Sequence, residues 1–192
     1  MSATNRGTKR NEADFYATPT DAIHNLLNHY VFTPYGTILE PGAGNGNIIK
    51  ALREKGYKNH ISAVELRKEE SENLKGLADE IIIADFLTYK TDAKYDVIIG
   101  NPPYSHAQDF IDRSLELLKP GGILIFLLRT NFLESKKRFE WWQDKPPTRL
   151  YVLAKRPSFT GKGTDATSYS WFIWEKNRHT YKFMHKQEIR II

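Results

Sequence analysis

Short apolar runs alternate along the chain with longer stretches in which apolar residues recur every three or four positions. The runs predict buried strands at residues 37–40, 61–66, 81–86, 95–100 and 122–128. The intervening stretches predict helices at residues 47–54, 68–76, 106–118 and 131–142, and another helix opens at Thr20 before the first strand. Two further strand-like runs, at residues 149–154 and 168–174, close the pattern.

This alternation predicts an α/β fold with a doubly wound, mostly parallel, Rossmann-like sheet of seven strands. A polar loop too short for a crossover helix separates the last two strands, so they should form a hairpin. The hairpin would place one antiparallel strand near the C-terminus. Ligands of such sheets bind beyond the carboxyl ends of the strands, so the residues that follow each run are the first candidates for a site.

The length of 192 residues predicts a single domain. We expect it to occupy residues 14–176, after a flexible polar tail at residues 1–13 and before a basic tail at residues 177–192. The chain has no Cys, which excludes a disulfide framework, a thiolate zinc site and a cysteine nucleophile. The N-terminus does not resemble a secretory signal, and no apolar run approaches the ~20 residues that span a bilayer. We therefore expect a soluble, cytoplasmic protein without a membrane partner.

Positive charge is concentrated in the last third of the chain. Lys and Arg number 28 against 23 Asp and Glu, and residues 130–192 alone hold 13 basic and 6 acidic side chains. The same third is rich in Trp, Tyr and Phe, and basic surfaces with exposed aromatic side chains bind nucleic acids. The alternative is that the aromatic residues form the core and the charges a solvated face. The pattern indicates a nucleic-acid partner without establishing one.

A glycine-rich turn follows the first predicted strand. Its sequence is Glu40-Pro41-Gly42-Ala43-Gly44-Asn45-Gly46, and alternating glycines let a backbone turn tightly and approach a ligand closely. The spacing differs from the G-x-G-x-x-G of dinucleotide-binding turns. The carboxylate of Glu40 also suits a positively charged ligand better than a pyrophosphate. An ordinary strand-to-helix loop is the alternative interpretation.

Carboxylates also end the second and third predicted strands. Glu65, followed by Leu66, lies 21 residues after Gly44, which is the spacing of an acid that binds ribose hydroxyls. Asp85, followed by Phe86, can accept a hydrogen bond from an adenine amine while the aromatic ring packs on the base. A ligand with an adenine, a free ribose and a positive charge but no phosphate is S-adenosylmethionine, which we predict as the cofactor.

The fourth predicted strand runs into Asn101-Pro102-Pro103-Tyr104, which supplies the candidate catalytic residues. Neither proline has a backbone N–H, so the turn offers carbonyl acceptors, and Asn101 adds its side-chain carbonyl. Such a turn suits a planar NH2 group, because two acceptors on its hydrogens favour a tetrahedral nitrogen with a localised lone pair. Tyr104 supplies a flat face for a base rotated out of its stack.

Residues 14–129 resemble the adenine-N6 DNA methyltransferases, which use S-adenosylmethionine. The resemblance rests on Asp14-Phe15-Tyr16-Ala17-Thr18-Pro19, on the glycine-rich turn and on the Asn-Pro-Pro-Tyr tetrapeptide. It implies a class I methyltransferase domain, in which Asn101 and Pro102 hold the target amine and Tyr104 stacks on the base. It also implies cofactor contacts from Tyr16, Thr18, Glu40, Pro41, Gly42, Gly44, Gly46, Glu65, Leu66, Asp85, Phe86 and Asn101.

A second segment, residues 156–165, is similar to small methyltransferases of phages and prophages. Lying between the last two strands, it would cover the active-site end, where Phe159 and Lys162 would touch the target base or phosphates. His106 lies close to Tyr104 in sequence and is a candidate for the substrate mouth. A surface hairpin and a surface histidine are the alternatives. The resemblance places the protein in a bacterial or phage-infected cell.

The leading hypothesis is methylation of the N6 amine of adenine in DNA. RNA adenine and the glutamine side chain of a protein also present planar amines and remain alternatives, as does a catalytically silent nucleic-acid-binding subunit. No stretch is long enough for the large target-recognition domain of restriction-type enzymes. Sequence recognition would then come from the basic last third or from a partner subunit. The six His show no metal-ligand spacing, so no metal site is expected.

Overall fold

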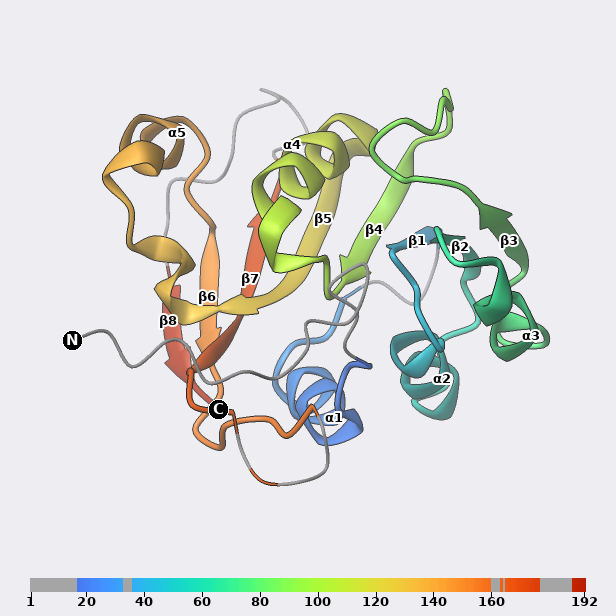
Figure 1. The fold of residues 1–192 in the computed structure, drawn as a ribbon, viewed down its shortest axis with the longest axis horizontal. Helices are drawn as coiled ribbons and strands as arrows, with labels where there is room; N and C mark the ends of the chain where they lie inside the picture. The colour runs from blue at the N-terminus through green and yellow to red at the C-terminus, as the bar shows by residue number, and fades with distance from the viewer. Residues whose placement is uncertain (1–16, 33–35, 160–162, 164, 177–187) are drawn as a thin grey trace.

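The computed structural model describes residues 17–32, 36–159, 163, 165–176 and 188–192 (Figure 1). Its strands are β1 (Thr37–Pro41), β2 (His60–Glu65), β3 (Glu80–Ile83), β4 (Tyr95–Gly100), β5 (Leu118–Arg129), β6 (Arg149–Val152), β7 (Tyr169–Glu175) and β8 (Glu188–Ile191). Its helices are α1 (Thr20–His29), α2 (Asn47–Glu54), α3 (Ser71–Leu74), α4 (Ala107–Leu117) and α5 (Phe139–Asp144). Short 3-10 turns lie at Lys68–Glu70, Tyr104–His106, Thr130–Leu133 and Lys136–Arg138.

The strands form one sheet in the order β3-β2-β1-β4-β5-β7-β6-β8. Neighbours are parallel except at β7, which runs antiparallel to both β5 and β6. The predicted doubly wound sheet with one antiparallel strand near the C-terminus is confirmed. The chain proceeds from β1 toward β3 in one direction and from β4 toward β7 in the other. The order therefore reverses between β1 and β4, where sheets of this class bind their ligands.

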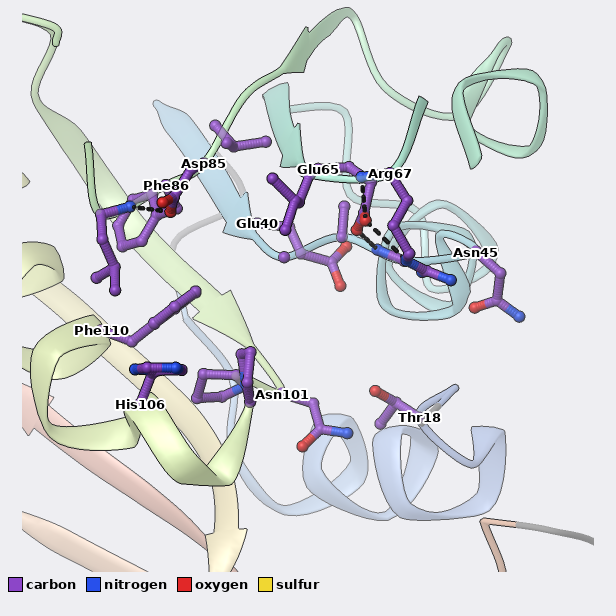
Figure 2. A pocket seen from close by; sticks show the side chains of 18 of the residues that line it. Thr18, Glu40, Asn45, Glu65, Arg67, Asp85, Phe86, Asn101, His106 and Phe110 are labelled. Atoms are coloured by element: carbon purple, nitrogen blue, oxygen red, sulfur yellow. Dashed lines mark hydrogen bonds and ion pairs between the residues drawn. The ribbon is translucent and has the colours of Figure 1, made fainter. Parts of the chain in front are cut away.

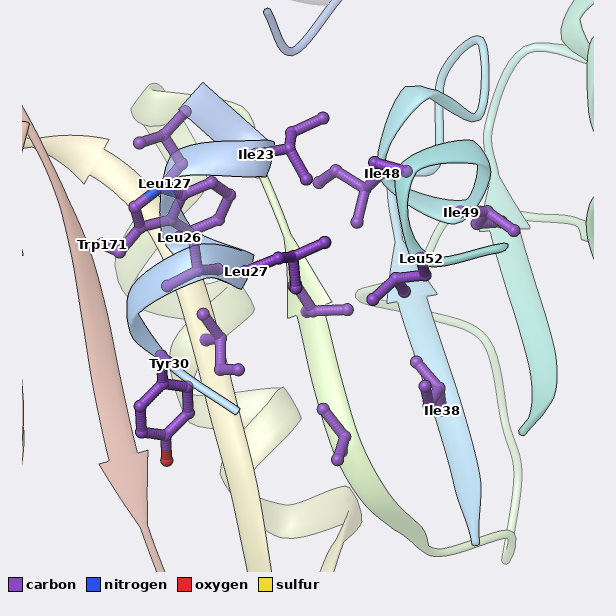
Figure 3. Close-up of a cluster of buried hydrophobic side chains, with 14 of the residues drawn as sticks. Ile23, Leu26, Leu27, Tyr30, Ile38, Ile48, Ile49, Leu52, Leu127 and Trp171 are labelled. Carbon is purple, nitrogen blue, oxygen red and sulfur yellow. The ribbon is translucent and has the colours of Figure 1, made fainter. Parts of the chain in front are cut away.

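Helices cover both faces of the sheet with apolar side chains. On one face α1 and α2 pack against the sheet (Figure 3); the residues buried here include Ile23, Leu26, Ile38, Ile48, Leu127 and Trp171. On the other face lies α4, with Trp141 and Trp142 of α5 beside it; the residues buried here include Phe110, Ile111, Leu124, Phe126, Phe172 and Trp174. Burial on both faces explains why the central strands are continuous apolar runs instead of alternating ones.

The first helix shows how the sequence sets these elements. The carbonyl of Pro19 accepts the N–H groups of Ala22 and Ile23, and Pro19 itself has the extended backbone of a residue outside the helix. The buried positions of α1 then recur at helical spacing; they are Ala22, Ile23, Leu26 and Leu27. The helix is therefore held by its apolar face against the sheet.

The sheet contains one strand more than the seven expected. Residues 188–191, expected in the basic tail, form β8 and pair in parallel with β6. Both Ile189 and Ile191 are exposed, so no buried apolar run marks this strand in the sequence. The N-terminal tail at residues 1–13 and residues 177–187 of the C-terminal tail lie outside the described residues.

The helix expected at residues 131–142 is replaced by 3-10 turns and the short α5. The Ser135 hydroxyl accepts the N–H of Lys137, and the Arg138 guanidinium donates to the carbonyls of Phe132 and Glu134. These side-chain bonds give the backbone partners other than those of a continuous helix. The third strand is also shorter than expected and ends at Ile83, so residues 85 and 86 lie in the turn after it.

Half of the ten aromatic residues that the structure describes in the last third belong to the buried core. Tyr151, Tyr169, Trp171, Phe172 and Trp174 are each at most 1% exposed. The alternative interpretation of this region, an aromatic core with a solvated charged face, therefore holds for these residues. Phe139, which is 63% exposed, remains on the surface. In the described part of the chain, no helix has the length and apolar character needed to cross a membrane.

Candidate active site

A cavity of about 420 Å³ opens at the carboxyl edge of the sheet, where the strand order reverses (Figure 2). Its volume lies within the ~300–1,000 Å³ typical of small-molecule sites. Residues at and after the carboxyl ends of β1, β2, β3 and β4 line it together with the segment before α1. Most of the predicted site residues meet here; those that line the cavity are Thr18, Glu40, Gly42, Gly44, Glu65, Leu66, Asp85, Phe86, Asn101, Pro102, Pro103, Tyr104 and His106.

The glycine loop (residues 40–46) owes its shape to three left-handed residues. Gly42, Gly44 and Gly46 have φ angles of 70°, 56° and 76°, a region that strains any residue with a Cβ. Gly46 then caps α2, and a Cβ there would lie 3.0 Å from the Leu77 side chain. Gly46 and Pro41 do not line the cavity themselves; Pro41 ends β1 and Gly46 shapes the turn.

Glu40 is a buried carboxylate in the wall of the cavity. The residue is 3% exposed, and its Oε2 atom has no hydrogen-bond partner among the described residues. Burial raises the pKa of this carboxyl well above its usual range, and the nearby Glu65 raises it further. A cation bound in the cavity would offset both effects, so the site favours a positively charged ligand.

Glu65 is fixed by hydrogen bonds to the loop across from it. Its Oε2 accepts the Gly44 N–H at 2.6 Å, and its Oε1 accepts the Arg67 N–H at 2.9 Å. Arg67, which was not predicted from the sequence, also forms ion pairs with Glu65 at 3.1 Å and Glu70 at 2.9 Å. Oε1 accepts both the backbone N–H and the Nε–H of Arg67, whereas Oε2 accepts the Gly44 N–H, so Glu65 keeps capacity for a ribose hydroxyl at Oε2.

The part of the cavity wall that follows β3 combines one acidic side chain with apolar side chains. Asp85 accepts the Leu87 N–H through Oδ1 at 2.9 Å, and Phe86 is buried with its ring centroid 5.0 Å from that of Phe110. Phe110 of α4 also lines the cavity and was not selected from the sequence. Leu66 is 59% exposed at the opening. These side chains offer one polar acceptor among flat and aliphatic surfaces, which suits a purine.

The Asn-Pro-Pro-Tyr tetrapeptide (residues 101–104) follows β4 directly. Gly100 before it is confined, because a Cβ there would lie 3.2 Å from the carbonyl oxygen of Pro41. This close approach of β4 to β1 places Asn101 in the wall of the same cavity as Glu40 (Figure 2). Burial raises the pKa of the Tyr104 phenol well above its usual range, and neighbouring Tyr169 adds to the rise. The phenol therefore stays neutral.

The segment before α1 joins the site through the backbone. Thr18 is buried, and its carbonyl accepts a hydrogen bond from the Asn47 side chain of α2 at 2.9 Å. This bond fixes the entry to α1 beside the glycine loop. Tyr16, the other residue predicted in this segment, lies outside the described residues.

Besides Tyr104, two of the candidate substrate residues, His106 and Phe159, are described by the structure. His106 is exposed at the rim, where its Nδ1 lies 3.7 Å from the Asp109 carboxylate. The Phe159 ring centroid lies 5.0 Å from that of Tyr169, which in turn lies 5.7 Å from that of Tyr104. Lys162 lies outside the described residues. Among the described residues, no group of three or more His, Asp or Glu is arranged to hold a metal ion.

Comparison with known proteins places these features in a family. The family model described as a methyltransferase domain matches residues 9–160. A protein of Listeria monocytogenes assigned to the class I S-adenosylmethionine-dependent methyltransferases shares the fold, with a TM-score of 0.66 over 90% of this chain and 63% of that one, at 17% identity.

Curated relatives include methyltransferases of two kinds. The Type II methyltransferase M.CvrRI of Paramecium bursaria Chlorella virus XZ-6E is 40% identical over 103 residues, which cover 50% of this chain and 26% of that protein. The tRNA1(Val) (adenine(37)-N6)-methyltransferase of Glaesserella parasuis is 27% identical over 192 aligned positions, covering 79% of this chain and 80% of that protein. The chain thus spans about a quarter of the viral relative.

The cofactor of this fold is S-adenosylmethionine, and the cavity fits it. A buried carboxylate oxygen without a partner suits the positive charge, and a held carboxylate with spare acceptor capacity suits a ribose. An acid beside Phe86 and Phe110 suits an adenine. The match of 152 residues, at positions 9–160, covers most of the chain, and the chain belongs to the methyltransferase domain family.

Proposed function

We propose that the protein transfers a methyl group from S-adenosylmethionine to the N6 amine of adenine in DNA. The observation that carries this proposal is the tetrapeptide at residues 101–104, which lies at the carboxyl end of β4 in the wall of the cofactor cavity. The relatives named as Type II methyltransferases support a DNA substrate. The net charge of +5 and the basic last third are consistent with a polyanionic partner.

In this mechanism the tetrapeptide activates the amine. The Asn101 side-chain oxygen and the Pro102 carbonyl accept the two N–H groups, which draws the nitrogen toward a tetrahedral geometry and localises its lone pair. Tyr104 presents its ring to the base, and its raised pKa keeps the phenol uncharged. The amine nitrogen gains the methyl carbon, and the proton that it loses passes to solvent.

The residues of the other strands would hold the cofactor. Glu65 would bind the ribose, Asp85 and Phe86 the adenine, and Thr18 the methionine end, with Glu40 beside the positive charge; the glycine loop and Leu66 complete the set. When bound, S-adenosylmethionine supplies an activated methyl group on a sulfonium, whose carbon–sulfur bond breaks with the electron pair moving to sulfur. With the cofactor held by these residues, the ring face of Tyr104 would remain accessible to the substrate.

The proposal also includes the limits of the domain and a partner that helps to recognise the substrate. We assign residues 14–176 to one methyltransferase domain. Selection of a DNA sequence would depend on the basic last third or on a partner subunit.

RNA adenine is the second candidate substrate. The tRNA (adenine-N6) relative aligns over 80% of its own length, whereas the viral DNA relative aligns over 26%. The basic last third suits either nucleic acid and does not separate them.

The decisive experiment measures methyl transfer from labelled S-adenosylmethionine to duplex DNA, single-stranded DNA, total RNA and a protein extract, followed by nucleoside analysis. We expect label as N6-methyladenine in DNA. N6-methyladenine in RNA alone would show that the substrate is RNA instead of DNA. Label in glutamine would show that the substrate is a protein. Absence of label in every sample, with cofactor binding measured by calorimetry, would favour a silent nucleic-acid-binding subunit.

Replacing Glu40 by glutamine should change stability and cofactor affinity in opposite directions. Because burial raises the folded-state pKa, Glu40 costs folding free energy at every pH above its unfolded-state pKa of about 4.3, where the unfolded chain ionises more readily than the folded one. We expect Glu40→Gln to raise the Tm of the cofactor-free protein at pH 7, with the difference vanishing as the pH falls toward 4. Loss of the charge should weaken S-adenosylmethionine by about 10- to 100-fold.

Calorimetry and thermal unfolding of Glu40→Gln and of Glu69→Gln, an exposed matched control, measure both effects. S-adenosylhomocysteine lacks the sulfonium charge, so its affinity should fall less than that of S-adenosylmethionine. Equal losses for the two ligands would show that Glu40 does not respond to that charge.

A further inference from the structure

Arg129 is the last residue of β5 and lies beside the catalytic tetrapeptide. Its guanidinium carbon is 5.1 Å from the centroid of the Tyr104 ring. The sheet order puts β5 next to β4 on the side away from β1, β2 and β3, which carry the cofactor-side residues (Figure 1). Arg129 is exposed and does not line the cofactor cavity. It therefore lies on the side from which a substrate would reach Tyr104.

A chain of hydrogen bonds holds Arg129 in this place. The antiparallel direction of β7 brings its first residue, Tyr169, directly opposite Arg129 in the sheet. The Arg129 Nε donates to the Tyr169 hydroxyl at 3.4 Å, and that hydroxyl donates to Asp165 Oδ2 at 2.8 Å. Burial raises the pKa of Tyr169 to about 12, so the phenol keeps the proton that it donates. Asp165 and Phe159 both come from the loop between β6 and β7, so the network joins that loop to the tetrapeptide.

Most of the guanidinium nevertheless remains available. Among the described residues, Arg129 has no carboxylate within ion-pair distance, whereas Arg53, Arg67 and Arg149 each form an ion pair. A guanidinium carries five N–H donors in a planar fork, and the contact with Tyr169 uses one of them. An exposed, oriented arginine with unused donors is suited to bidentate binding of a phosphate.

We propose that Arg129 binds a backbone phosphate of the strand that presents the target base to Tyr104, with Tyr169 and Asp165 as positioning residues for its guanidinium. The proposal rests on the proposed function in taking a nucleic acid as substrate. A nucleotide carries its phosphate and its base on one sugar. A cation next to the aromatic face of Tyr104 therefore matches both parts of one nucleotide. Because a phosphate contact reads no base, it would fix the strand without specifying its sequence.

Binding of fluorescent 20-nucleotide single-stranded and duplex DNA, followed by anisotropy over a range of salt concentrations, tests this assignment. Arg129→Gln removes the charge at similar length, and Arg129→Lys keeps it. Lys58→Gln is the matched control. Lys58 is exposed and precedes β2, so it lies at the amino-terminal end of a parallel strand, whereas Arg129 lies at the carboxyl end of β5. Tyr169→Phe keeps the ring and removes the hydroxyl that links Arg129 to Asp165. Calorimetry with S-adenosylmethionine and circular dichroism check that each variant is folded.

We expect Arg129→Gln to bind DNA about tenfold more weakly, with the slope of log K against log salt smaller by about 0.9 for duplex and 0.7 for single strands. Arg129→Lys and Tyr169→Phe should keep the slope, and Tyr169→Phe should lose affinity because the guanidinium is no longer held. Cofactor affinity should be unchanged in all four variants. An unchanged slope and affinity in Arg129→Gln, or an equal loss in Lys58→Gln, would overturn the assignment.

The outcome is separable from that of the methyl-transfer assay. If the wild-type protein binds DNA through Arg129 but forms no N6-methyladenine, the proposed reaction fails and the phosphate contact stands. If the wild-type protein binds neither DNA nor RNA while it methylates protein glutamine, the phosphate contact is wrong.

Discussion

Replacing Asn101 by alanine is expected to lower kcat for methyl transfer by about 100- to 1,000-fold, the cost of losing one aligned hydrogen-bond partner of a transition state. The reason is that the Pro102 carbonyl alone cannot hold both N–H groups of the amine. Cofactor affinity should change by less than tenfold, because Glu40, Glu65 and Asp85 approach the cavity from other strands. Single-turnover transfer of label, with calorimetry of cofactor binding, separates the two quantities.

Asn45→Ala is the matched control for this variant. Asn45 also lines the cavity, but it belongs to the glycine loop and lies far from Asn101 at the rim (Figure 2). It should retain kcat within a few-fold. An Asn101→Ala enzyme with a kcat near that of the wild type would refute the role of the tetrapeptide. A parallel loss of cofactor binding would instead assign Asn101 mainly to the cofactor.

The sequence predicted the cofactor side of the site because that side depends on strand ends alone. Glu40, Glu65 and Asp85 each lie at the end of a predicted strand, and parallel strands present their carboxyl ends at one edge. No knowledge of side-chain packing is needed to bring them together. Even the error at the third strand, which ends at Ile83, moves Asp85 into a turn that still lines the cavity.

The residues missed on this side depend on local geometry instead. Phe110 lines the cavity from α4, and the helical pattern indicates only that it is buried somewhere. Arg67 follows Glu65 by two positions and folds back onto it, which becomes evident once the turn after β2 is known. The contacts of Phe110 and Arg67 can be identified only once the directions of their side chains are known.

The substrate side required the order of the strands. Arg129 and Tyr169 are 40 positions apart and meet because β7 pairs antiparallel with β5. The hairpin of the last two strands was predicted, but which of them lies next to β5 was not. Likewise β8 joins the sheet through a parallel pairing with β6. Its apolar residues are exposed, so no buried apolar pattern in the sequence predicts this strand. Non-local pairings of this kind leave little trace in a single sequence.

Trp171→Ala is expected to destabilise the protein by about 3–5 kcal/mol, the usual cost of removing a buried Trp side chain. Trp171 is fully buried between the sheet and α1 (Figure 3), and its Nε1 donates to the Ala22 carbonyl at 3.1 Å. For a domain of this size the Tm should fall by about 10 °C. Urea unfolding followed by circular dichroism measures the loss. A loss below 1 kcal/mol would contradict this packing.

Trp174→Ala separates stability from function. Trp174 is equally buried, but on the opposite face of the sheet, where its Nε1 donates to the Lys145 carbonyl at 3.0 Å. Both variants should lose similar stability. Only Trp171→Ala should also weaken S-adenosylmethionine at a temperature where each variant is folded, because α1 continues from Thr18 and the Thr18 carbonyl is bonded to Asn47 at the cavity. Equal cofactor affinities in the two variants would show that α1 does not transmit its packing to the site.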